Sequence, residues 1–273
     1  MGCQTLYSTA LALMPNVEEL DLWHVRITKH LLRSMIALKC LKSLSLTRCF
    51  FWGIGDDIRK LSVLRLKSLR YLVWGDGYPL LASSLCLDSL LTLNTNHASF
   101  LTRIAEQDCH LPLQELELGV TSPKERFLLE AFQAQEDLDL LPKVFQKIPA
   151  LKKLTILNAM IPQHEIQFND VLPVLEELCC PSFLLQSLVP GRPILKLQTT
   201  WHGSSSEIID NIQPLTGMRI RSLSVPVDVY QKVSELFPDL ESLRLEERNI
   251  HDLFDPQSSF KVFAIYSLIK VKC

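Results

Sequence analysis

The chain has 273 residues, of which 47% are hydrophobic and 21% charged, values that are ordinary for a globular protein. Its formal net charge of −2 and its pI of about 6.4 supply no overall attraction to nucleic acid or to an anionic membrane. Small groups of basic residues occur, but acidic residues interrupt them in the sequence, so we expect no nucleic acid and no membrane as partner.

The cysteines bear on the cellular compartment. Eight cysteines are scattered along the chain without a C-x-x-C pair, no N-x-S/T glycosylation site is present, and the N-terminus lacks a signal-peptide pattern. Extracellular disulfide frameworks and zinc sites are recognised by regular cysteine spacing, which is missing here. We therefore expect free thiols and an intracellular protein, in the cytoplasm, the nucleus or both.

Short leucine motifs begin near the N-terminus. A helix is predicted over residues 5–14, and Val17, Leu20 and Leu22 then follow the spacing L-x-x-L-x-L. The clearest copy is Leu41–Cys49, which reads L-x-x-L-x-L-x-x-C and resembles a leucine-rich repeat. In this motif a short strand sends the fourth and sixth residues into the core, and the residues between them face outward. Because no strand precedes the first helix, we expect the first repeat to be incomplete.

The motif recurs along the whole chain, which contains 52 leucines. First positions are separated by about 24 residues on average, within the range of roughly 20–29 residues that is typical of leucine-rich repeats. The eleven predicted first positions are Val17, Leu41, Leu69, Leu90 (with Leu87 as the alternative register), Leu113, Leu151, Leu175, Ile194, Ile220, Leu240 and Phe260.

Helices are predicted between the strands. Residues 28–38, 99–107 and 228–237 have amphipathic spacing, and Ser204–Glu207 matches an S-x-x-E capping box at the start of a helix. An alternation of strands and helices with this period favours a parallel sheet with helices on one side.

Two intervals are longer than the period. Residues 113–151 include an enlarged helical insertion over about 124–148, and residues 41–69 hold a second long connection. Neither resembles a linker between domains. We predict a single α/β domain over residues 1–273, a curved leucine-rich-repeat solenoid of about 11 irregular repeats with a parallel sheet on the concave side and helices on the convex side.

Catalytic motifs are absent from the sequence. It contains no G-x-S-x-G, no G-x-x-x-x-G-K and no H-E-x-x-H, and Gly53-Ile-Gly55 lacks the third glycine of a dinucleotide-binding loop. The histidines lack the spacing of metal ligands. We predict no catalytic residue, no cofactor and no metal, and a protein that is not an enzyme. An enzyme with an unrecognised site is retained as an alternative.

What remains is a binding surface. The outward side chains of neighbouring strands would form rows on the concave face, where solenoids commonly bind proteins. Trp23 and Tyr71 are large aromatic residues of the type enriched in interface hot spots, or else they cover neighbouring strands. The partner-binding candidates on this face are Glu19, Asp21, Trp23, Tyr71, Glu115, Glu117, Lys153, Thr155, Arg244 and Glu246.

Longer phrases add a family resemblance. Met14–Ile27 followed by Leu41–Leu46, and later Leu188–Leu197 and Ile220–Leu243, resemble the repeat region of fungal F-box/leucine-rich-repeat proteins, the basidiomycete group in particular. The resemblance implies a substrate receptor, in which an F-box binds the adaptor of a cullin-type ubiquitin ligase and the repeats select a target. This chain opens directly into repeats, so the ligase adaptor is expected as a partner only if an F-box lies upstream.

The prediction for function is a non-catalytic protein–protein interaction module. The resemblance implies that the module is the substrate-recognition arm of an F-box-type ubiquitin-ligase receptor, with a target protein that the sequence does not identify. A truncated or degenerate paralogue that keeps the fold without ligase coupling is the alternative.

Overall fold

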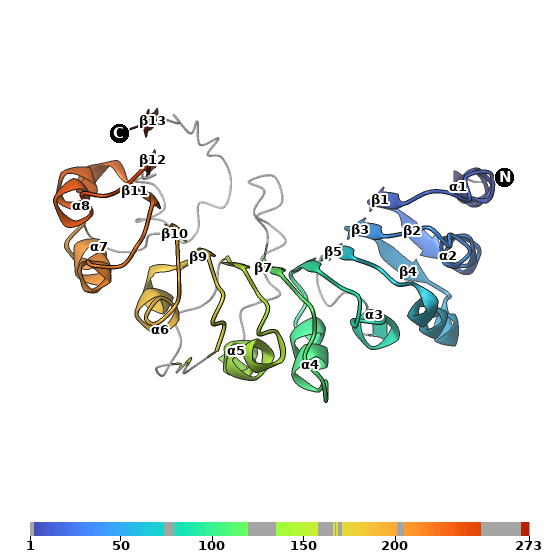
Figure 1. The fold of residues 1–273 in the computed structure, drawn as a ribbon. Coiled ribbons are helices and arrows are strands. Elements are labelled where there is room, and N and C mark those ends of the chain that lie inside the picture. The colour runs from blue at the N-terminus through green and yellow to red at the C-terminus, as the bar shows by residue number, and fades with distance from the viewer. Residues whose placement is uncertain are drawn as a thin grey trace. The chain divides into compact units, whose positions relative to one another are not determined.

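The computed structural model describes residues 3–73, 78, 80–119, 135–157, 166, 168, 171–200, 205–246 and 269–272. The chain divides into two compact units, Met1–Leu175 (unit 1) and Glu176–Cys273 (unit 2). Each unit contains its own strands and helices (Figure 1). That the two units form one domain stays a prediction.

Among the described residues, the main sheet of unit 1 has six parallel strands in the order β1-β3-β5-β6-β7-β8. Leu20 pairs with Leu44, Leu44 with Leu69, and Leu69 with Leu93, so equivalent leucines of successive repeats lie side by side. They point to the same side of the sheet because successive residues of a strand alternate between its faces. The strands are β1 (Glu19–Trp23), β3 (Ser43–Thr47), β5 (Ser68–Leu72), β6 (Thr92–Thr95), β7 (Glu115–Leu118) and β8 (Lys153–Ile156).

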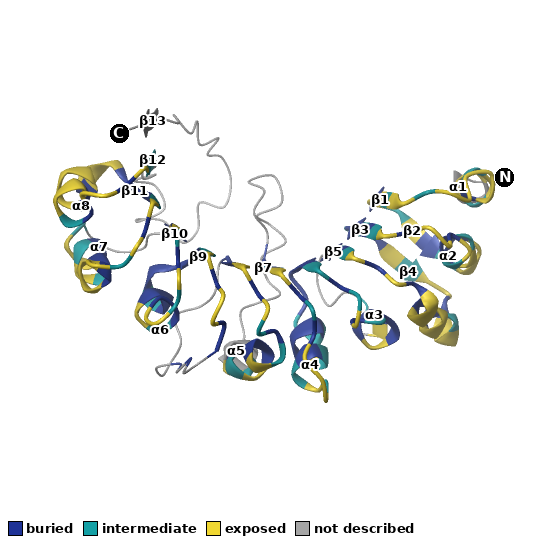
Figure 2. Cartoon of the chain, viewed as in Figure 1, coloured by how far each residue is buried: buried dark blue, intermediate teal, exposed yellow. Residues whose placement is uncertain are grey.

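The helices of unit 1 lie on one side of this sheet (Figure 1). Buried residues gather where the helices face the strands (Figure 2). Helix α2 shows the pattern, because it buries Leu31, Leu32 and Met35 completely. Burial of such a side chain stabilises the fold by about 1.5–3 kcal/mol. The helices are α1 (Cys3–Ala12), α2 (Lys29–Ile36), the 3₁₀ segment η1 (Gly55–Val63), α3 (Leu80–Ser84), α4 (Ser99–Ala105) and α5 (Gln135–Lys147).

The register of β5 corrects one predicted repeat. Leu69 pairs with Leu44 and Tyr71 with Leu46, so the motif is Leu66-x-x-Leu69-x-Tyr71 and the predicted start at Leu69 is wrong. Tyr71 therefore points into the core, where its side chain is 0% exposed. The outward positions of β5 are those of Ser68 and Arg70. From Leu41 to Leu66 the interval is 25 residues, so this connection is no insertion.

The ambiguous register of the next repeat is also resolved. Leu93 pairs with Leu69 on one side and with Leu116 on the other, which places the motif start at Leu90 rather than Leu87. Asn96 follows this strand and is buried. Its Oδ1 accepts the backbone N–H of Val73 at 2.9 Å and its Nδ2 donates to the carbonyl of Val73 at 2.8 Å. One side chain thus satisfies both backbone groups of the residue that follows β5.

The first two repeats also form a second parallel sheet of two strands, one from each repeat, directly after β1 and β3. Strand β2 (Arg26–Thr28) pairs with β4 (Phe50–Trp52), Arg26 lying opposite Phe50 and Thr28 opposite Trp52. The leucine pattern does not predict these strands. The turns that lead into them place His24 at φ 57° and Arg48 at φ 55°. Residues other than glycine rarely adopt this left-handed backbone conformation, although histidine does so more readily than most.

Unit 2 repeats the same arrangement. Strands β9, β10, β11 and β12 are parallel neighbours in this order, whereas β13 runs antiparallel to β12. The core-facing Leu178, Leu197, Leu223 and Leu243 occupy equivalent places. The elements are β9 (Glu177–Pro181), η3 (Ser182–Leu184), α6 (Leu185–Leu188), β10 (Lys196–Thr200), α7 (Ser205–Ile212), η4 (Gln213–Leu215), β11 (Ser222–Pro226), η5 (Val227–Val229), α8 (Tyr230–Leu236), β12 (Ser242–Glu246) and β13 (Ile269–Lys272).

Each unit is a stack of leucine-rich repeats. The predicted α/β class and the parallel sheet with helices on one side are confirmed within both units, except that β13 of unit 2 is antiparallel to its neighbour. Of the predicted helical insertion, α5 is observed and residues 124–134 lie outside the described residues, as do Ser204 of the capping box and the predicted repeat start at Phe260. None of the helices in the described part of the chain is long and apolar enough to cross a membrane.

Candidate protein-binding surface

The outward residues of unit 1 form rows across its strands, and the predicted candidates other than Tyr71 divide among three places. Glu19, Asp21 and Trp23 lie on β1, at one end of the strand order. The residues that pair with them on β3 are Ser43, Ser45 and Thr47. A second group lies on β7 and β8, and Arg244 and Glu246 lie on β12 of unit 2. Neighbouring strands are about 4.8 Å apart, so four strand steps separate β1 from β7 by about 19 Å.

The second group contains an ion pair within the chain. Glu115 lies opposite Lys153, and Lys153 Nζ is 3.8 Å from Glu115 Oε2. The two charges are exposed to about the same extent and belong to adjacent repeats. Glu117 lies opposite Thr155, which is 7% exposed. This group therefore offers a partner one compensated ion pair, with Glu117 half-buried beside it.

The acids on β1 are different. Glu19 and Asp21 are exposed, and neither takes part in an ion pair with any residue in the part of the chain that the structure describes. The neighbouring Glu18 is paired instead, with Lys42 at 2.7 Å. The residues opposite Glu19 and Asp21 are Ser43 and Ser45, which carry no charge. Two negative charges are therefore presented together on the outward face of this strand.

Exposed aromatic residues continue from this row. Trp23 is 60% exposed, Phe50 49% and Trp52 64%. The ring of His24 connects the first two, with its centroid 5.9 Å from that of Trp23 and 5.9 Å from that of Phe50. The guanidinium carbon of Arg26 lies 5.2 Å from the ring centroid of Trp52. We call Trp23, His24, Arg26, Phe50 and Trp52 the aromatic surface.

The β2–β4 sheet is what assembles the aromatic surface. Its register puts Arg26 beside Phe50, and alternate residues of each strand share a face. On the opposite face, Ile27 is completely buried, so these strands are fixed to the core. Hydrogen bonds from His24 N to Thr47 O at 2.8 Å and from Phe50 N to Val25 O at 3.0 Å hold the turns.

Sequence reasoning identified Trp23 and missed the rest of the aromatic surface. The sequence does indicate that Arg26 and Phe50 lie side by side, since they are separated by the same 24 residues as the paired Leu20 and Leu44. Side chains that share an offset with a repeat motif occupy equivalent places in neighbouring repeats. Conversely, Tyr71 was placed on this face and belongs to the core. Its ring lies 5.7 Å from that of Phe100 and 5.9 Å from that of His97, measured between centroids.

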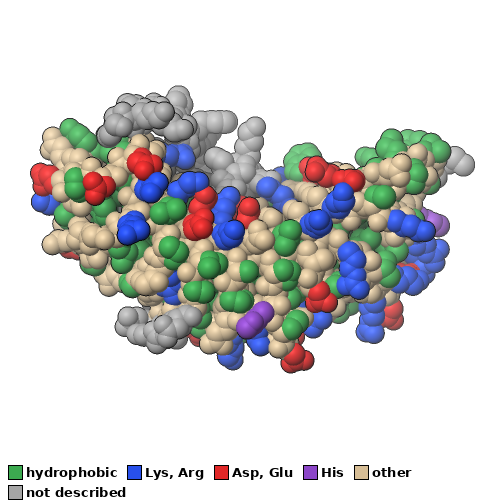
Figure 3. Space-filling model, in the orientation of Figure 1, with side chains coloured by type: hydrophobic (Ala, Val, Ile, Leu, Met, Phe, Trp, Pro, Cys, Tyr) green, Lys and Arg blue, Asp and Glu red, His purple; other side chains and the backbone are tan. Residues whose placement is uncertain are grey.

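Hydrophobic side chains also gather at the N-terminal end of unit 1, near α1 (Figure 3). Leu6 is 70% exposed, Leu13 77% and Met14 54%. Elsewhere on the face in view, acidic and basic side chains are interspersed (Figure 3). Contiguous exposed apolar residues mark interaction sites more often than isolated ones do. The N-terminal repeats therefore carry the most pronounced apolar exposure in the described part of unit 1.

Comparisons with known proteins identify no family for this chain. No family model matches the sequence, and no curated protein matches it. Among solved structures it is similar to an internalin from Listeria monocytogenes, at 14% sequence identity and a TM-score of 0.33. The match covers 81% of this chain and 66% of the internalin chain, slightly under two thirds of that chain's length.

The buried thiols serve structure. Cys49 is 7% exposed, and its Sγ lies 3.2 Å from the carbonyl oxygen of Leu22 in the preceding repeat. Burial raises the pKa of the Cys49 thiol, which keeps it protonated and able to donate to that carbonyl. Burial also raises the pKa of Cys180, which is 0% exposed. Both thiols are therefore poor nucleophiles, and their contacts lie within the core of the repeats.

A serine–histidine contact in unit 1 has a local explanation. Ser99 Oγ lies 2.7 Å from His97 Nδ1, which also accepts the backbone N–H of Ser99 at 3.2 Å. The backbone N–H of His97 in turn donates to Thr95 Oγ1 at 3.1 Å. These bonds satisfy polar groups where α4 begins, as helix starts require. In the part of the chain that the structure describes, no three histidine, cysteine or acidic residues are grouped as metal ligands.

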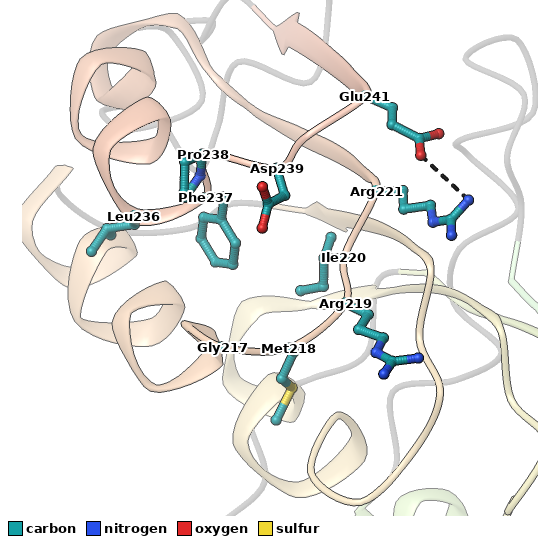
Figure 4. A pocket seen from close by; sticks show the side chains of 10 residues that line it. All are labelled: Gly217, Met218, Arg219, Ile220, Arg221, Leu236, Phe237, Pro238, Asp239 and Glu241. Atoms are coloured by element: carbon teal, nitrogen blue, oxygen red, sulfur yellow. Dashed lines mark ion pairs between the residues drawn. The ribbon is translucent and has the colours of Figure 1, made fainter.

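Unit 2 contains a cavity of about 450 Å³ next to the turns that precede β11 and β12 (Figure 4). Charges of both signs line it, and Arg221 Nη1 pairs with Glu241 Oε1 at 3.3 Å. Apolar residues, including Met218 and Phe237, form the rest of its wall. The lining residues are Gly217, Met218, Arg219, Ile220, Arg221, Leu236, Phe237, Pro238, Asp239 and Glu241.

Proposed function

We propose that this protein is a non-catalytic protein-interaction module that binds its partner on the N-terminal repeats of unit 1. One observation carries the proposal: the unpaired acids of β1 adjoin the aromatic surface, so charge and large exposed rings are contiguous. Aromatic residues and arginine are the side chains most enriched in interface hot spots. Rings that are about half exposed or more would be desolvated by a bound protein.

The finer proposal is that the module is the substrate-recognition arm of an F-box-type ubiquitin-ligase receptor. Its support is the resemblance of Met14–Ile27, Leu188–Leu197 and Ile220–Leu243 to the repeats of that group. In this role the aromatic surface would hold the target protein, and an intracellular location follows. A truncated or degenerate paralogue without ligase coupling is the alternative, and so is an enzyme with an unrecognised site.

Quantitative affinity capture separates these possibilities. The wild-type chain and the double variant Trp23→Ala/Trp52→Ala are immobilised, and the proteins they retain from an extract of the source cells are compared by mass spectrometry. Tyr230→Ala is the matched control, because Tyr230 is 44% exposed on unit 2 and lies outside the aromatic surface. Equal thermal midpoints establish that all three chains are folded.

A partner of the proposed surface is retained by the wild type and by Tyr230→Ala but is lost from the double variant. Co-retention of a ligase adaptor supports the ligase arm, whereas targets without an adaptor leave a binding module uncoupled from a ligase. If every retained protein binds the double variant as well as the wild type, the proposed surface is wrong. A degenerate paralogue would retain no specific partner at all.

A further inference from the structure

The charges of unit 1 are distributed unevenly over its outward face. Glu115 and Lys153 neutralise each other on β7 and β8, and Glu18 is neutralised by Lys42. Glu117 is half-buried, and its Oε1 atom is shielded from solvent. Glu19 and Asp21 stand out as exposed acids without an ion pair in the described part of this face. An approaching chain therefore meets negative charge at β1.

The immediate neighbours on the sheet leave this charge uncompensated. Ser43 and Ser45 lie directly opposite Glu19 and Asp21 and have short, neutral side chains. Successive outward residues of a strand are about 7 Å apart, which places the Asp21 carboxylate within reach of a side chain that also contacts Trp23. A lysine or arginine side chain has this length, with an apolar stem and a cationic head.

The aromatic surface already contains an example of the contact that such a residue would make. The guanidinium of Arg26 lies over the ring of Trp52, whereas Trp23 makes an edge contact with His24 at an interplanar angle of 69°. Cations bind preferentially over the face of an indole ring. Trp23 thus presents an exposed indole ring next to two acids. A cation of the partner would lie over this ring as Arg26 lies over the ring of Trp52.

From these contacts we infer that the segment bound at this surface carries a lysine or arginine flanked by an apolar residue. The cation pairs with Asp21 and Glu19 and extends its stem across Trp23, and the apolar residue packs on Phe50 and Trp52. This inference rests on the proposed function, because it specifies the partner of the same surface. The acids of β1 repel a second copy of β1 and an anionic membrane, because both are negatively charged. A basic protein segment is therefore the partner that this surface favours.

Peptide selection tests the inference even while the target protein is unidentified. A phage-displayed library of random linear peptides is selected on the folded chain, and the composition of the bound pool is compared with that of the unselected library. We expect lysine and arginine next to aromatic or aliphatic residues to be enriched by at least about threefold. The charge-reversed double variant Glu19→Lys/Asp21→Lys should instead enrich aspartate and glutamate.

Individual peptides then report which residues matter. In calorimetric titrations Asp21→Asn should weaken binding by about fivefold, as expected for one exposed ion pair. Trp23→Ala should weaken it by more than about tenfold, as expected for an aromatic hot spot. Asp239→Asn is the matched control, an exposed acid on unit 2, and should leave binding unchanged.

The outcomes distinguish the two proposals. Peptides that depend on Trp23 and Trp52 but show no basic enrichment would overturn the inference and leave the proposed function intact. Peptides insensitive to both tryptophan substitutions, or a library that yields no binder, would overturn both. Sedimentation with phosphatidylserine-containing vesicles that is lost in Trp52→Ala would identify a membrane surface as the ligand and would likewise overturn the inference.

Discussion

The phenolic oxygen of Tyr71 lies 2.8 Å from the backbone nitrogen of Tyr78 and accepts its hydrogen bond. Tyr71 occupies the sixth place of its repeat motif, where leucine is usual, and its ring is completely buried. Burial also raises the pKa of the Tyr71 hydroxyl, which therefore stays protonated over the physiological range. The extra length of tyrosine connects the core of one repeat to the chain that leads into α3.

Tyr71→Phe tests this connection. The substitution keeps the ring but removes the acceptor of the Tyr78 N–H, so we expect the free energy of unfolding to fall by about 1 kcal/mol. Tyr71→Ala removes the ring as well and should cost about 3–5 kcal/mol. Urea denaturation followed by circular dichroism measures both. Tyr7→Phe is the control, because Tyr7 is 45% exposed, and it should have no measurable effect.

Two asparagines close together in the sequence make a matched pair. Asn96 satisfies both backbone groups of Val73, so Asn96→Ala should destabilise unit 1 by about 1–3 kcal/mol. Asn94 is 9% exposed, and its Oδ1 atom has no hydrogen-bond partner among the described residues. Asn94→Leu should therefore be neutral or slightly stabilising, because it removes an unsatisfied buried acceptor. Equal losses in the two variants would contradict these different roles, and thermal denaturation of both provides the comparison.

Asp57 links α2 to η1 and should make stability depend on pH in acid. Its carboxylate contacts Lys60 and lies 2.7 Å from Lys29 Nζ. Hydrogen bonds from Lys29 and Lys60 lower its pKa from 3.8 to about 2. A carboxylate with a lowered pKa in the folded state stabilises the protein fully above its unfolded-state pKa, and this contribution is lost as the pH falls towards the folded-state pKa.

The measurement is the difference in melting temperature between the wild type and Asp57→Asn. We expect a constant difference above about pH 5 that shrinks between pH 4 and pH 2, because only the wild type then loses a charge. Asp56→Asn is the control, since Asp56 is adjacent and 90% exposed. A difference that grows as the pH falls through this range would show that the sign of the linkage is wrong.

A substitution at Leu44 tests whether neighbouring repeats share one core. It is completely buried and pairs with Leu20 on one side and Leu69 on the other. Leu44→Ala should lower the free energy of unfolding by about 2–5 kcal/mol, because a cavity would remain between three repeats. Leu13→Ala is the matched control, since Leu13 is 77% exposed. Hydrogen exchange should show the loss of protection in β1 and β5 as well as in β3 if the repeats unfold together.

Much of the fold could be predicted from leucine spacing alone. The motif at Leu41 determines which side of β3 is buried, because alternate residues of a strand point to opposite faces and the leucines occupy only one of them. The prediction failed at β5, where Leu66, Leu69 and Leu72 allow two frames and the aromatic Tyr71 concealed the correct one. Only pairing with Leu44 and Leu46 decides between them, and pairing is a property of the folded chain.

The binding surface was harder to predict, for a different reason. Whether an outward charge is available depends on its neighbour in space, and Glu115 and Lys153 are far apart in the sequence. Of the predicted candidates, β1 keeps its three outward side chains exposed, whereas Tyr71 and Thr155 are buried. Arg244 is exposed on β12, and the side chain of Glu246 lies outside the described residues. Partner binding by any of these residues stays a prediction.

The left-handed turn at His24 has a consequence for protein engineering. Glycine is the residue that best tolerates a φ of 57°, so His24→Gly is the obvious substitution for making unit 1 more robust to heat. The same change would delete the ring that bridges Trp23 and Phe50. Selection for thermal tolerance alone would thus tend to dismantle the recognition surface, and a stabilised scaffold made from these repeats should be altered at Arg48 before His24.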